Sequence, residues 1–440
     1  MSQTTAFAAA AGLPLAASTI TAQLRPRHRL RGPALTVLAL LPFALGYFVS
    51  YFVRTINGAA ADGFVRELGV GPADLGVMTS LYFLTFAAFQ MPAGVLIDRY
   101  GPFRVQAGLF VVEAAGALVF ASSQNLAMLM LGRALLGMGC AGALLSGMKM
   151  LALVLRPERR ALGNCALVMA GGLGAMASAA PIGRLLPPGD WRSLFLALAV
   201  IALAISAVLW RQSPAHTARA TATAAPTLGE ITAGLLAILR DARFWRMAPL
   251  SASVVGAAFA LHGLWAAHWL ADVAGLASSE VSRVLLLMGA SLTVGAAGFG
   301  VLATALRRRG VSTMALFRAA ATGLIGIEAA MAWGSTAAPA LLMAGLALFG
   351  AITVLSFTAL GELFPPATVG RANAALNVLH LGGAFVLQSG IGLIAAFWPA
   401  DVSGHLPQPA YGSALAAVIA VQILAIIWYQ LQPRFAAAFR

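Results

Sequence analysis

The sequence predicts an all-α membrane protein with twelve transmembrane helices. Of its 440 residues, 60% are hydrophobic and only 10% are charged, and the mean hydropathy is +0.87. Such a chain has too little polar surface to cover a soluble globule. Its apolar segments are continuous rather than alternating, and they approach the length of about 20 residues that a helix needs to cross a bilayer. Strands are therefore not expected.

Twelve apolar segments can be placed in order. The first six are expected at 34–58, 72–96, 103–122, 125–150, 161–182 and 191–210. The last six are expected at 246–270, 280–306, 313–334, 338–360, 372–398 and 411–431. Between the two sets, Leu228 to Arg240 is amphipathic and follows a stretch rich in Ala, Thr and Pro, which indicates a linker with an interfacial helix.

These segments divide the chain into five parts. We expect a cytosolic tail at 1–33, a six-helix bundle at 34–210, a cytoplasmic linker at 211–245, a second six-helix bundle at 246–432 and a cytosolic tail at 433–440.

The arginines predict the orientation in the membrane. They gather in alternate connections, and cytoplasmic loops are enriched in Arg and Lys. With the N-terminus inside, four loop arginines lie outside: Arg66, Arg184, Arg192 and Arg283. The apolar stretch 6–17 is not expected to be a secretory signal, because its basic residues follow it. The composition suggests a bacterial chain, so we expect the inner membrane, with both termini in the cytoplasm.

A glycine- and arginine-rich turn joins the second and third segments. It reads Gly94-Val-Leu-Ile-Asp98-Arg99-Tyr-Gly101-Pro-Phe-Arg104. We expect Gly94 to let two helices approach closely, Gly101 to form the turn, and Arg99 and Arg104 to mark the cytoplasmic face. An acid at the membrane edge calls for a partner, which we expect Asp98 to find among arginines or at a helix N-terminus.

This turn resembles the signature G-x-x-x-D-R-x-G between the second and third helices of major facilitator superfamily transporters. The resemblance implies two pseudo-symmetric six-helix bundles that rock about a midplane cavity. It also implies that Asp98, with its neighbours in the turn, acts as a conformational latch. The second half carries a degenerate copy of this turn, Gly300 to Gly310, in which Thr304 stands where the first half has Asp98. The two halves are therefore expected to close unequally.

The first segment ends in a polar face. Tyr47, Tyr51, Arg54 and Gly58 recur at i, i+4, i+7 and i+11, which places them on one side of a helix. Two interpretations stay open for Arg54. Its guanidinium can donate paired hydrogen bonds to an oxyanion, or its side chain can reach out to the outer headgroups.

The same stretch has a second resemblance. Tyr51, Arg54 and Asn57 form a Tyr-x-x-Arg-x-x-Asn pattern similar to the first helix of the anion:cation symporter branch of the superfamily. There the arginine binds the anionic group of the substrate, which implies the same role for Arg54 beside Tyr51 and Asn57. The branch carries an acid just before the arginine that takes part in proton coupling. This chain has Val53 instead, so that role has no counterpart at this position.

Three further charged residues lie within apolar segments, where a charge is costly and therefore a functional candidate. Arg133 begins the run Arg133-Ala-Leu-Leu-Gly137-Met-Gly139, similar to the superfamily pattern R-x-x-x-G-x-G, whose glycines permit close packing. Arg133 is interpreted either as a proton-coupling or substrate-contacting group or as half of a structural ion pair. Glu113 and Glu328 are either proton carriers or partners of a nearby arginine.

Histidines and tryptophans on later segments complete the candidates. His262 and Trp265 share a face of the seventh segment with Trp269, and the resemblance implies that this segment lines the cavity. Histidine can bind an anion when charged and titrates near physiological pH, so His262 is a candidate substrate ligand and His380 a candidate for proton coupling. The tryptophans could instead form an interfacial aromatic belt.

The function expected from these residues is proton-coupled uptake of a small organic anion. Two alternatives remain: an efflux antiporter of small or amphipathic compounds, and a non-transporting sensor or assembly factor. Nucleotide-binding spacing is absent from the sequence, and we expect no enzymatic activity, cofactor, metal or nucleic-acid partner. The expected partners are the substrate, protons and the lipid bilayer, and the expected state is a monomer.

Overall fold

A computed structural model describes residues 33–155, 157–179, 190–213, 228–365, 368–401 and 404–438, and these residues form helices joined by short connections. The predicted tails and the predicted linker lie partly or largely outside the described residues. Within the described residues no strand is present, in agreement with the predicted all-α class.

The helices follow one another in two sets. The first set comprises α3 (Pro33–Thr55), α4 (Asn57–Leu68), α5 (Pro72–Tyr100), α6 (Pro102–Ala121), α7 (Leu126–Cys140), α8 (Ala143–Val154), α9 (Pro157–Ala179) and α10 (Trp191–Gln212). The second set comprises α12 (Leu228–Leu239), α13 (Ala242–Ala260), η3 (Leu261–Trp265), α14 (Ala266–Asp272), α15 (Ser278–Arg307), α16 (Thr313–Ala332), α17 (Pro339–Gly350), α18 (Thr353–Leu363), α19 (Val369–Ala395) and α20 (Gln408–Ala438).

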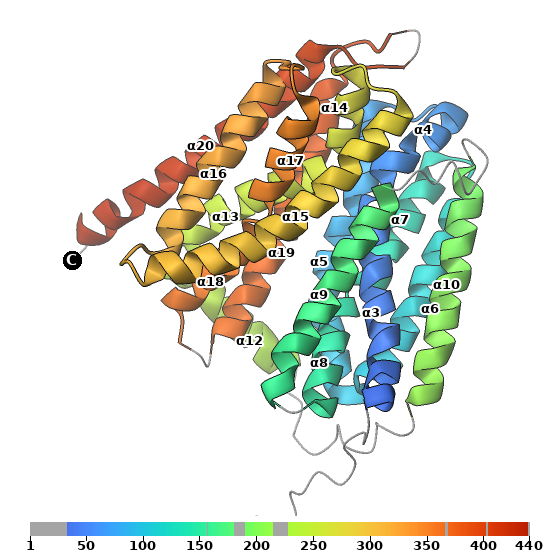
Figure 1. The fold of residues 1–440 in the computed structure, drawn as a ribbon, viewed down its shortest axis with the longest axis vertical. Coiled ribbons are helices and arrows are strands. Elements are labelled where there is room, and N and C mark those ends of the chain that lie inside the picture. Colours follow the sequence, from blue (N-terminus) through green and yellow to red (C-terminus); the bar gives the residue numbers. More distant parts are fainter. Residues whose placement is uncertain are drawn as a thin grey trace, which may run out of the picture.

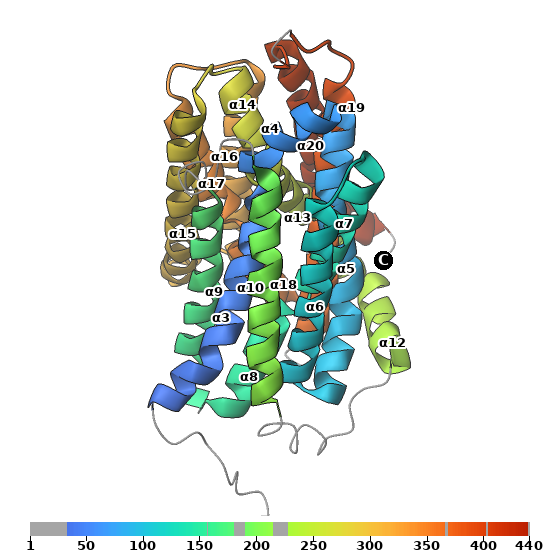
Figure 2. The ribbon, with the colours of Figure 1, turned by 90° about the vertical axis from the view of Figure 1, so that its right-hand side faces the viewer.

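The two sets lie side by side as two groups of helices in Figure 1, and in the turned view of Figure 2 the first group lies largely in front of the second. Helices α3 to α10 pack mainly on one another, and α13 to α20 do the same. The groups meet where α5 lies along α19 and α9 lies along α15, and where α4 contacts η3 and α14. In the view of Figure 1, the second group tilts away from the first toward the lower left.

The lengths of the helices fit a polytopic membrane protein. Ten candidate membrane spans occur among the described residues, with α7 and α8 counted together, as are α13 to α14 and α17 to α18. Two shorter apolar helices, Ala39–Thr55 and Ala166–Ser178, coincide with the first and fifth predicted segments. Each of the twelve predicted segments thus has a helical counterpart.

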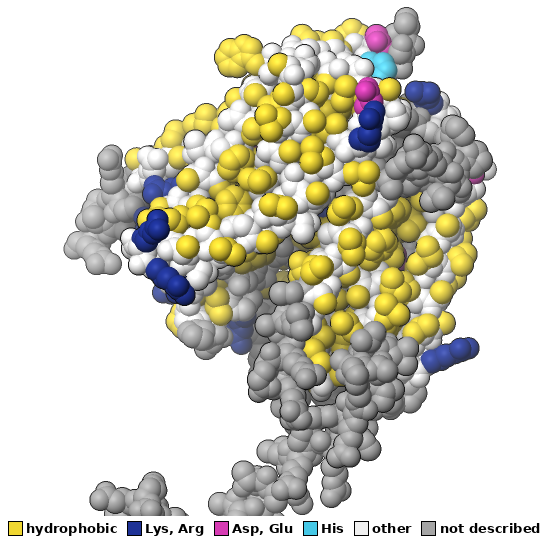
Figure 3. All heavy atoms as spheres, in the orientation of Figure 1, with side chains coloured by type: hydrophobic (Ala, Val, Ile, Leu, Met, Phe, Trp, Pro, Cys, Tyr) yellow, Lys and Arg dark blue, Asp and Glu magenta, His cyan; other side chains and the backbone are white. Residues whose placement is uncertain are grey.

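Large apolar side chains cover much of the flank of the molecule (Figure 3). Val200, Val294 and Leu424 are 67%, 63% and 64% exposed, although each lies in a long apolar helix. A water-soluble protein rarely exposes so much apolar surface, whereas a bilayer covers it without penalty.

Two local features depart from the predicted segments. The first predicted helix is broken at Ile56, and α4 follows it as a separate helix that buries Ala61 and Phe64 and carries Arg66 and Glu67. The seventh span is interrupted by η3, a π-helical turn in which the amide of Ala266 donates to the carbonyl of Leu261, five residues earlier. The pattern of apolar residues cannot predict either feature, since neither changes how apolar the segment is.

Candidate functional site

The guanidinium group of Arg54 lies among aromatic rings between the two groups of helices. Its central carbon lies 4.5 Å from the ring centroid of Tyr51, 5.4 Å from that of Phe86 and 5.5 Å from that of Phe259. The rings of Tyr82 and Phe83 lie 6.0 and 5.9 Å away. We call these five rings the aromatic cage. Ring faces attract a cation but do not neutralise it.

The cage needs both groups of helices. Tyr51 comes from α3, and Tyr82, Phe83 and Phe86 come from α5, whereas Phe259 comes from α13 and stacks on Phe83 with a centroid distance of 6.1 Å. The Nε atom of Arg54 is buried without a hydrogen-bond partner, and no described carboxylate forms a salt bridge with this side chain. Its positive charge is therefore uncompensated at the interface of the bundles.

The π-helical turn brings the second group of helices against Arg54. A Cβ atom built on Gly263 would lie 3.7 Å from the carbonyl oxygen of Arg54 and 3.5 Å from Oε1 of Gln388. The side-chain amide of Gln388 is fully buried, and neither its oxygen nor its nitrogen has a partner. An unpaired buried amide is costly in an apolar setting, which marks Gln388 as a candidate ligand. No pattern in the sequence indicates this residue as a ligand.

His262 and Trp265 take different positions. His262, in η3, is half-buried and precedes Gly263 in the turn that faces the backbone of Arg54. Trp265 is buried, and its indole N–H donates to the carbonyl of Gln388 at 3.0 Å. Trp269 is also buried and donates to the carbonyl of Met331 at 3.1 Å, so neither indole belongs to an interfacial belt.

Asn57 lies at the first turn of α4 and faces α5. Its side-chain nitrogen donates to Oγ1 of Thr79 at 3.0 Å, while its oxygen is buried without a partner. Asn57 thus joins Gln388 as a buried amide with unused hydrogen-bonding capacity near the bundle interface.

Arg133 is connected to Arg54 through the backbone. Its Nη1 atom donates at 2.9 Å to the carbonyl of Val53, the residue before Arg54, while Nε and Nη2 are buried without partners. The glycines after it pack as predicted, since a Cβ on Gly139 would lie 2.6 Å from Cβ of Glu113. Both carboxylate oxygens of Glu113 lack hydrogen bonds. The structure therefore places Arg133 and Glu113 on adjacent helices without joining them in an ion pair.

Glu328 and His380 form their hydrogen bonds within the second group of helices. Oε1 of Glu328 accepts from Gln422 at 3.2 Å, and Nε2 of His380 lies 2.7 Å from Oγ of Ser251. His380 precedes Gln388 by eight residues on α19, a rise of about 12 Å. The structure thus does not bring either residue into the aromatic cage.

The acid of the glycine- and arginine-rich turn pairs with a lysine. Oδ1 of Asp98 accepts a hydrogen bond from Nζ of Lys149 on α8 at 2.7 Å, rather than from an arginine as expected. Gly101 has φ +84 and separates α5 from α6, as predicted. Arg104 donates from Nε to Oγ of Ser213 at 3.0 Å, and the guanidinium of Arg99 lies 5.3 Å from the ring of Tyr100.

The expectation for Gly94 was wrong. A Cβ atom at this position would meet nothing within 4 Å, so Gly94 does not mediate a close helix contact in this conformation. Glycines that do so include Gly76 of α5, which faces α19, and Gly132, Gly137 and Gly139 of α7, which face Phe120, Tyr82 with Thr85, and Glu113.

The second half contains a counterpart of the Asp98–Lys149 pair with the charges exchanged. Nη1 of Arg307, at the end of α15, lies 3.1 Å from Oε1 of Glu362 on α18. In the first half the longer helix carries the acid, whereas in the second half it carries the base. Thr304 stands in the second half where Asp98 stands in the first. The second half nevertheless contains an ion pair, because Glu362 of α18 provides the acid.

Comparisons with known proteins agree with this architecture. The family model of the Major Facilitator Superfamily matches residues 43–387. The uncharacterized transporter YgaY of Escherichia coli O157:H7 is 28% identical over 195 residues, which are 43% of this chain and 47% of that protein. The probable sulfoacetate transporter SauU of Cupriavidus necator is 22% identical over 210 residues, 47% of each chain. The matches thus span about half the length of these curated relatives.

Solved structures share the fold along nearly the whole chain. A bacterial homologue of the human lysosomal transporter Spinster, in an inward-facing and unoccupied conformation, has a TM-score of 0.70 at 15% identity and covers 90% of this chain and 96% of its own. The nucleoside transporter NupG has a TM-score of 0.71 at 11% identity, with 89% and 99% covered. With a family model that matches most of its length and a fold shared with these structures, the chain belongs to the Major Facilitator Superfamily, whose multi-pass helical architecture it has.

Proposed function

We propose that this transporter takes up a small organic anion together with protons, and that Arg54 binds the anionic group. The observation that carries the proposal is the uncompensated guanidinium of Arg54 in a cage formed by both bundles. A guanidinium can donate two parallel hydrogen bonds to a carboxylate or sulfonate. In a site lined by rings rather than water, such charge-assisted bonds are strong.

The second bundle supplies the remaining ligands in this proposal. Gln388 offers an amide with two free donor hydrogens, and His262 is next to Gly263, whose Cβ position lies 3.7 Å from the carbonyl oxygen of Arg54. Tyr51 holds the guanidinium from the first bundle, and Asn57 offers a free oxygen for a polar substituent of the substrate. A substrate held between Arg54 and Gln388 would favour closure of the bundles around it. SauU is named for sulfoacetate, so organic anions are the first class to test.

Glu113 is the proposed proton carrier. Its carboxyl group has no hydrogen bond, and it packs against α7 at Gly139. Arg133, which lies on α7 with Gly139, donates a hydrogen bond to the carbonyl of Val53, the residue before Arg54. Protonation of Glu113 can therefore change the packing of α7 and, through Arg133, the position of Arg54. Glu328 and His380 remain less direct candidates, because their hydrogen bonds lie within the second bundle.

Two alternatives give different results in the same assay. An efflux antiporter for amphipathic compounds would suit the aromatic rings, but the charge of Arg54 disfavours cationic cargo. A sensor would carry no flux. We also propose that the protein is a monomer of the inner membrane with both termini in the cytoplasm, as the distribution of arginines predicts.

Transport by purified protein in liposomes tests the proposal. With an inward proton gradient, a panel of mono- and dicarboxylates and sulfonates, including sulfoacetate, should contain a substrate that accumulates. Arg54→Ala should reduce its uptake at least 100-fold and Arg54→Lys about tenfold, because lysine lacks the planar fork. Arg283→Ala, which removes a 73% exposed arginine on α15, is the matched control and should leave uptake unchanged. Full uptake by Arg54→Ala would refute the role of Arg54.

A further inference from the structure

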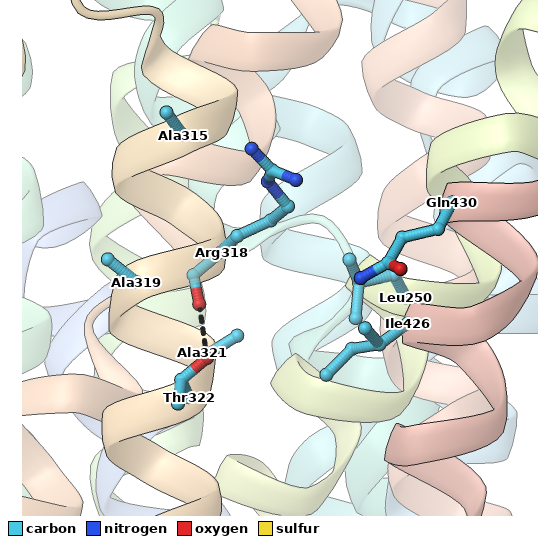
Figure 4. A pocket seen from close by; sticks show the side chains of 8 residues that line it. All are labelled: Leu250, Ala315, Arg318, Ala319, Ala321, Thr322, Ile426 and Gln430. Carbon is cyan, nitrogen blue, oxygen red and sulfur yellow. Dashed lines mark hydrogen bonds between the residues drawn. The ribbon is translucent and has the colours of Figure 1, made fainter. Parts of the chain in front are cut away.

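A pocket on the outer surface of the second bundle is separate from the aromatic cage. It has a volume of about 320 Å³ and lies between α13, α16 and α20. Its lining includes Leu250, Arg318, Thr322, Ile426 and Gln430 (Figure 4). Arg318, Thr322 and Gln430 are exposed, so the pocket opens away from the bundle.

Two arginines converge beside this pocket without an acid to pair with. The guanidinium carbons of Arg318 and Arg246 lie 5.6 and 5.0 Å from the centroid of the same ring, that of Tyr429. Nε of Arg246 is buried without a hydrogen-bond partner. No described carboxylate forms a salt bridge with either arginine. The site therefore carries two positive charges whose hydrogen-bonding capacity is largely unused.

The pocket has both polar and apolar lining. On α16, Arg318 lies five residues from the start, about 8 Å along the axis, and Thr322 lies one turn farther along. Gln430 likewise lies one turn nearer the end of α20 than Ile426 does. The arginine-rich ends of these helices are predicted to be cytoplasmic. With that orientation, Arg318 and Gln430 would lie nearer the cytoplasmic headgroups than Thr322 and Ile426, which lie one turn farther along the same helices.

We propose that this pocket binds the phosphate of an anionic phospholipid of the cytoplasmic leaflet. Arg318 and Arg246 would bind the phosphate oxygens, Gln430 would donate a further hydrogen bond, and an acyl chain would lie against Leu250 and Ile426. Basic pockets between transmembrane helices suit anionic headgroups. The alternative is that each arginine only extends its side chain to the membrane interface, which requires neither a second arginine nor a pocket. Here two guanidinium groups contact the ring of Tyr429 beside a cavity.

Thermal unfolding of the full-length protein in detergent tests this site. Added phosphatidylglycerol should raise the Tm by about 3 °C, a typical response to a modest binding free energy. Phosphatidylcholine, whose choline group offsets the phosphate charge, should raise the Tm by less than half as much. Arg318→Gln and Arg246→Gln should each lose at least half of the phosphatidylglycerol effect. Arg309→Gln, which removes an exposed arginine just beyond the end of α15, should keep the effect.

A further measurement with inorganic phosphate distinguishes a lipid headgroup from a soluble phosphate ion. No effect of millimolar phosphate would support a lipid, whereas an equal rise in Tm that depends on Arg318 would support the phosphate site but assign it to a soluble anion. Equal stabilisation of wild type, Arg318→Gln and Arg246→Gln by phosphatidylglycerol would overturn the proposal. Counting bound lipids by native mass spectrometry keeps the test valid if a variant is less stable. Since Arg54 takes no part, failure here leaves the proposed transport function untouched.

Discussion

Lys149 donates a hydrogen bond to Asp98 at 2.7 Å and so ties α8 to the end of α5. Lys149 is the single lysine of the chain. The side chains are 41% and 36% exposed, and exposed ion pairs contribute only about 0–1 kcal/mol to stability. Their effect should therefore appear in the conformational equilibrium rather than in the stability of the fold.

Neutralising this pair should alter transport more than stability. We expect Lys149→Gln and Asp98→Asn each to slow transport about three- to tenfold, while the free energy of unfolding changes by less than about 1 kcal/mol. The exchanged pair, Asp98→Lys with Lys149→Asp, should recover part of the rate, because Arg307 and Glu362 already work with reversed charges. Uptake assays and urea unfolding measure the two effects. An exchanged pair slower than both single variants would contradict the latch.

Gln388→Leu should separate stability from binding. The buried amide has no partner, so an apolar side chain of similar size removes an unsatisfied polar group and should leave the Tm unchanged or raise it. If Gln388 binds substrate, the same change should raise the Kd about tenfold or more. Thermal unfolding and binding calorimetry provide the two values. Ser389→Ala, on the same helix, removes a 2.6 Å hydrogen bond to Ser80 and should instead lower stability by about 1 kcal/mol.

Alanine substitutions at two glycines of α19 should have opposite effects. A Cβ on Gly392 would lie 3.2 Å from Cα of Gly76 and still closer to the carbonyl of Pro72, across the interface with α5. Gly392→Ala should destabilise this closed contact and reduce transport. At Gly390 nothing lies within 4 Å, so Gly390→Ala should stabilise the helix by up to about 1 kcal/mol. Measurements of thermal unfolding and of uptake should distinguish the two variants. Equal changes in Tm and uptake for both would contradict a special role of the Gly392 contact.

The cluster of Glu67, Trp191 and Arg192 should make stability depend on pH in the acid range. Hydrogen bonds from Arg192 at 2.6 Å and from Trp191 at 2.9 Å lower the pKa of Glu67 in the folded protein. A depressed pKa means that the stabilisation is present above the unfolded value of about 4.3 and is lost as the pH falls through the lower folded value. The Tm of Glu67→Gln should therefore fall less than that of wild type between about pH 5 and pH 3. Identical slopes would exclude this contribution.

Replacing each of the two buried acids, Glu113 and Glu328, with glutamine should distinguish a role in proton coupling from a structural role. Glu113→Gln should keep exchange of labelled substrate across the membrane but lose accumulation driven by the proton gradient, because the amide cannot release a proton. Glu328→Gln should keep both, since the carboxyl is already hydrogen-bonded to Gln422 within the second bundle. Gradient-driven accumulation by Glu113→Gln would remove this residue from the coupling mechanism.

The sequence predicted the spans well, because continuous apolar length is a strong signal in a bilayer protein. It also indicated Arg54, since a charge in such a segment stands out. Gln388 was missed because a neutral amide in a long apolar helix carries no comparable signal, and its importance depends on the absence of a partner in three dimensions. Lys149 was missed as the partner of Asp98 because 51 residues separate them. Pairing across helices depends on the bundle, which local patterns do not encode.

The π-helical turn at Leu261–Trp265 has a consequence for aligning this chain with its relatives. Each residue of an α-helix advances about 100° around the axis, so one extra residue in a turn rotates everything beyond it by that amount. Ala266 to Asp272 are therefore out of phase with the residues before Leu261. A relative with an uninterrupted helix would match this chain in space only with a one-residue gap within 261–265. An ungapped alignment would pair His268 and Trp269 with residues on another side of the helix.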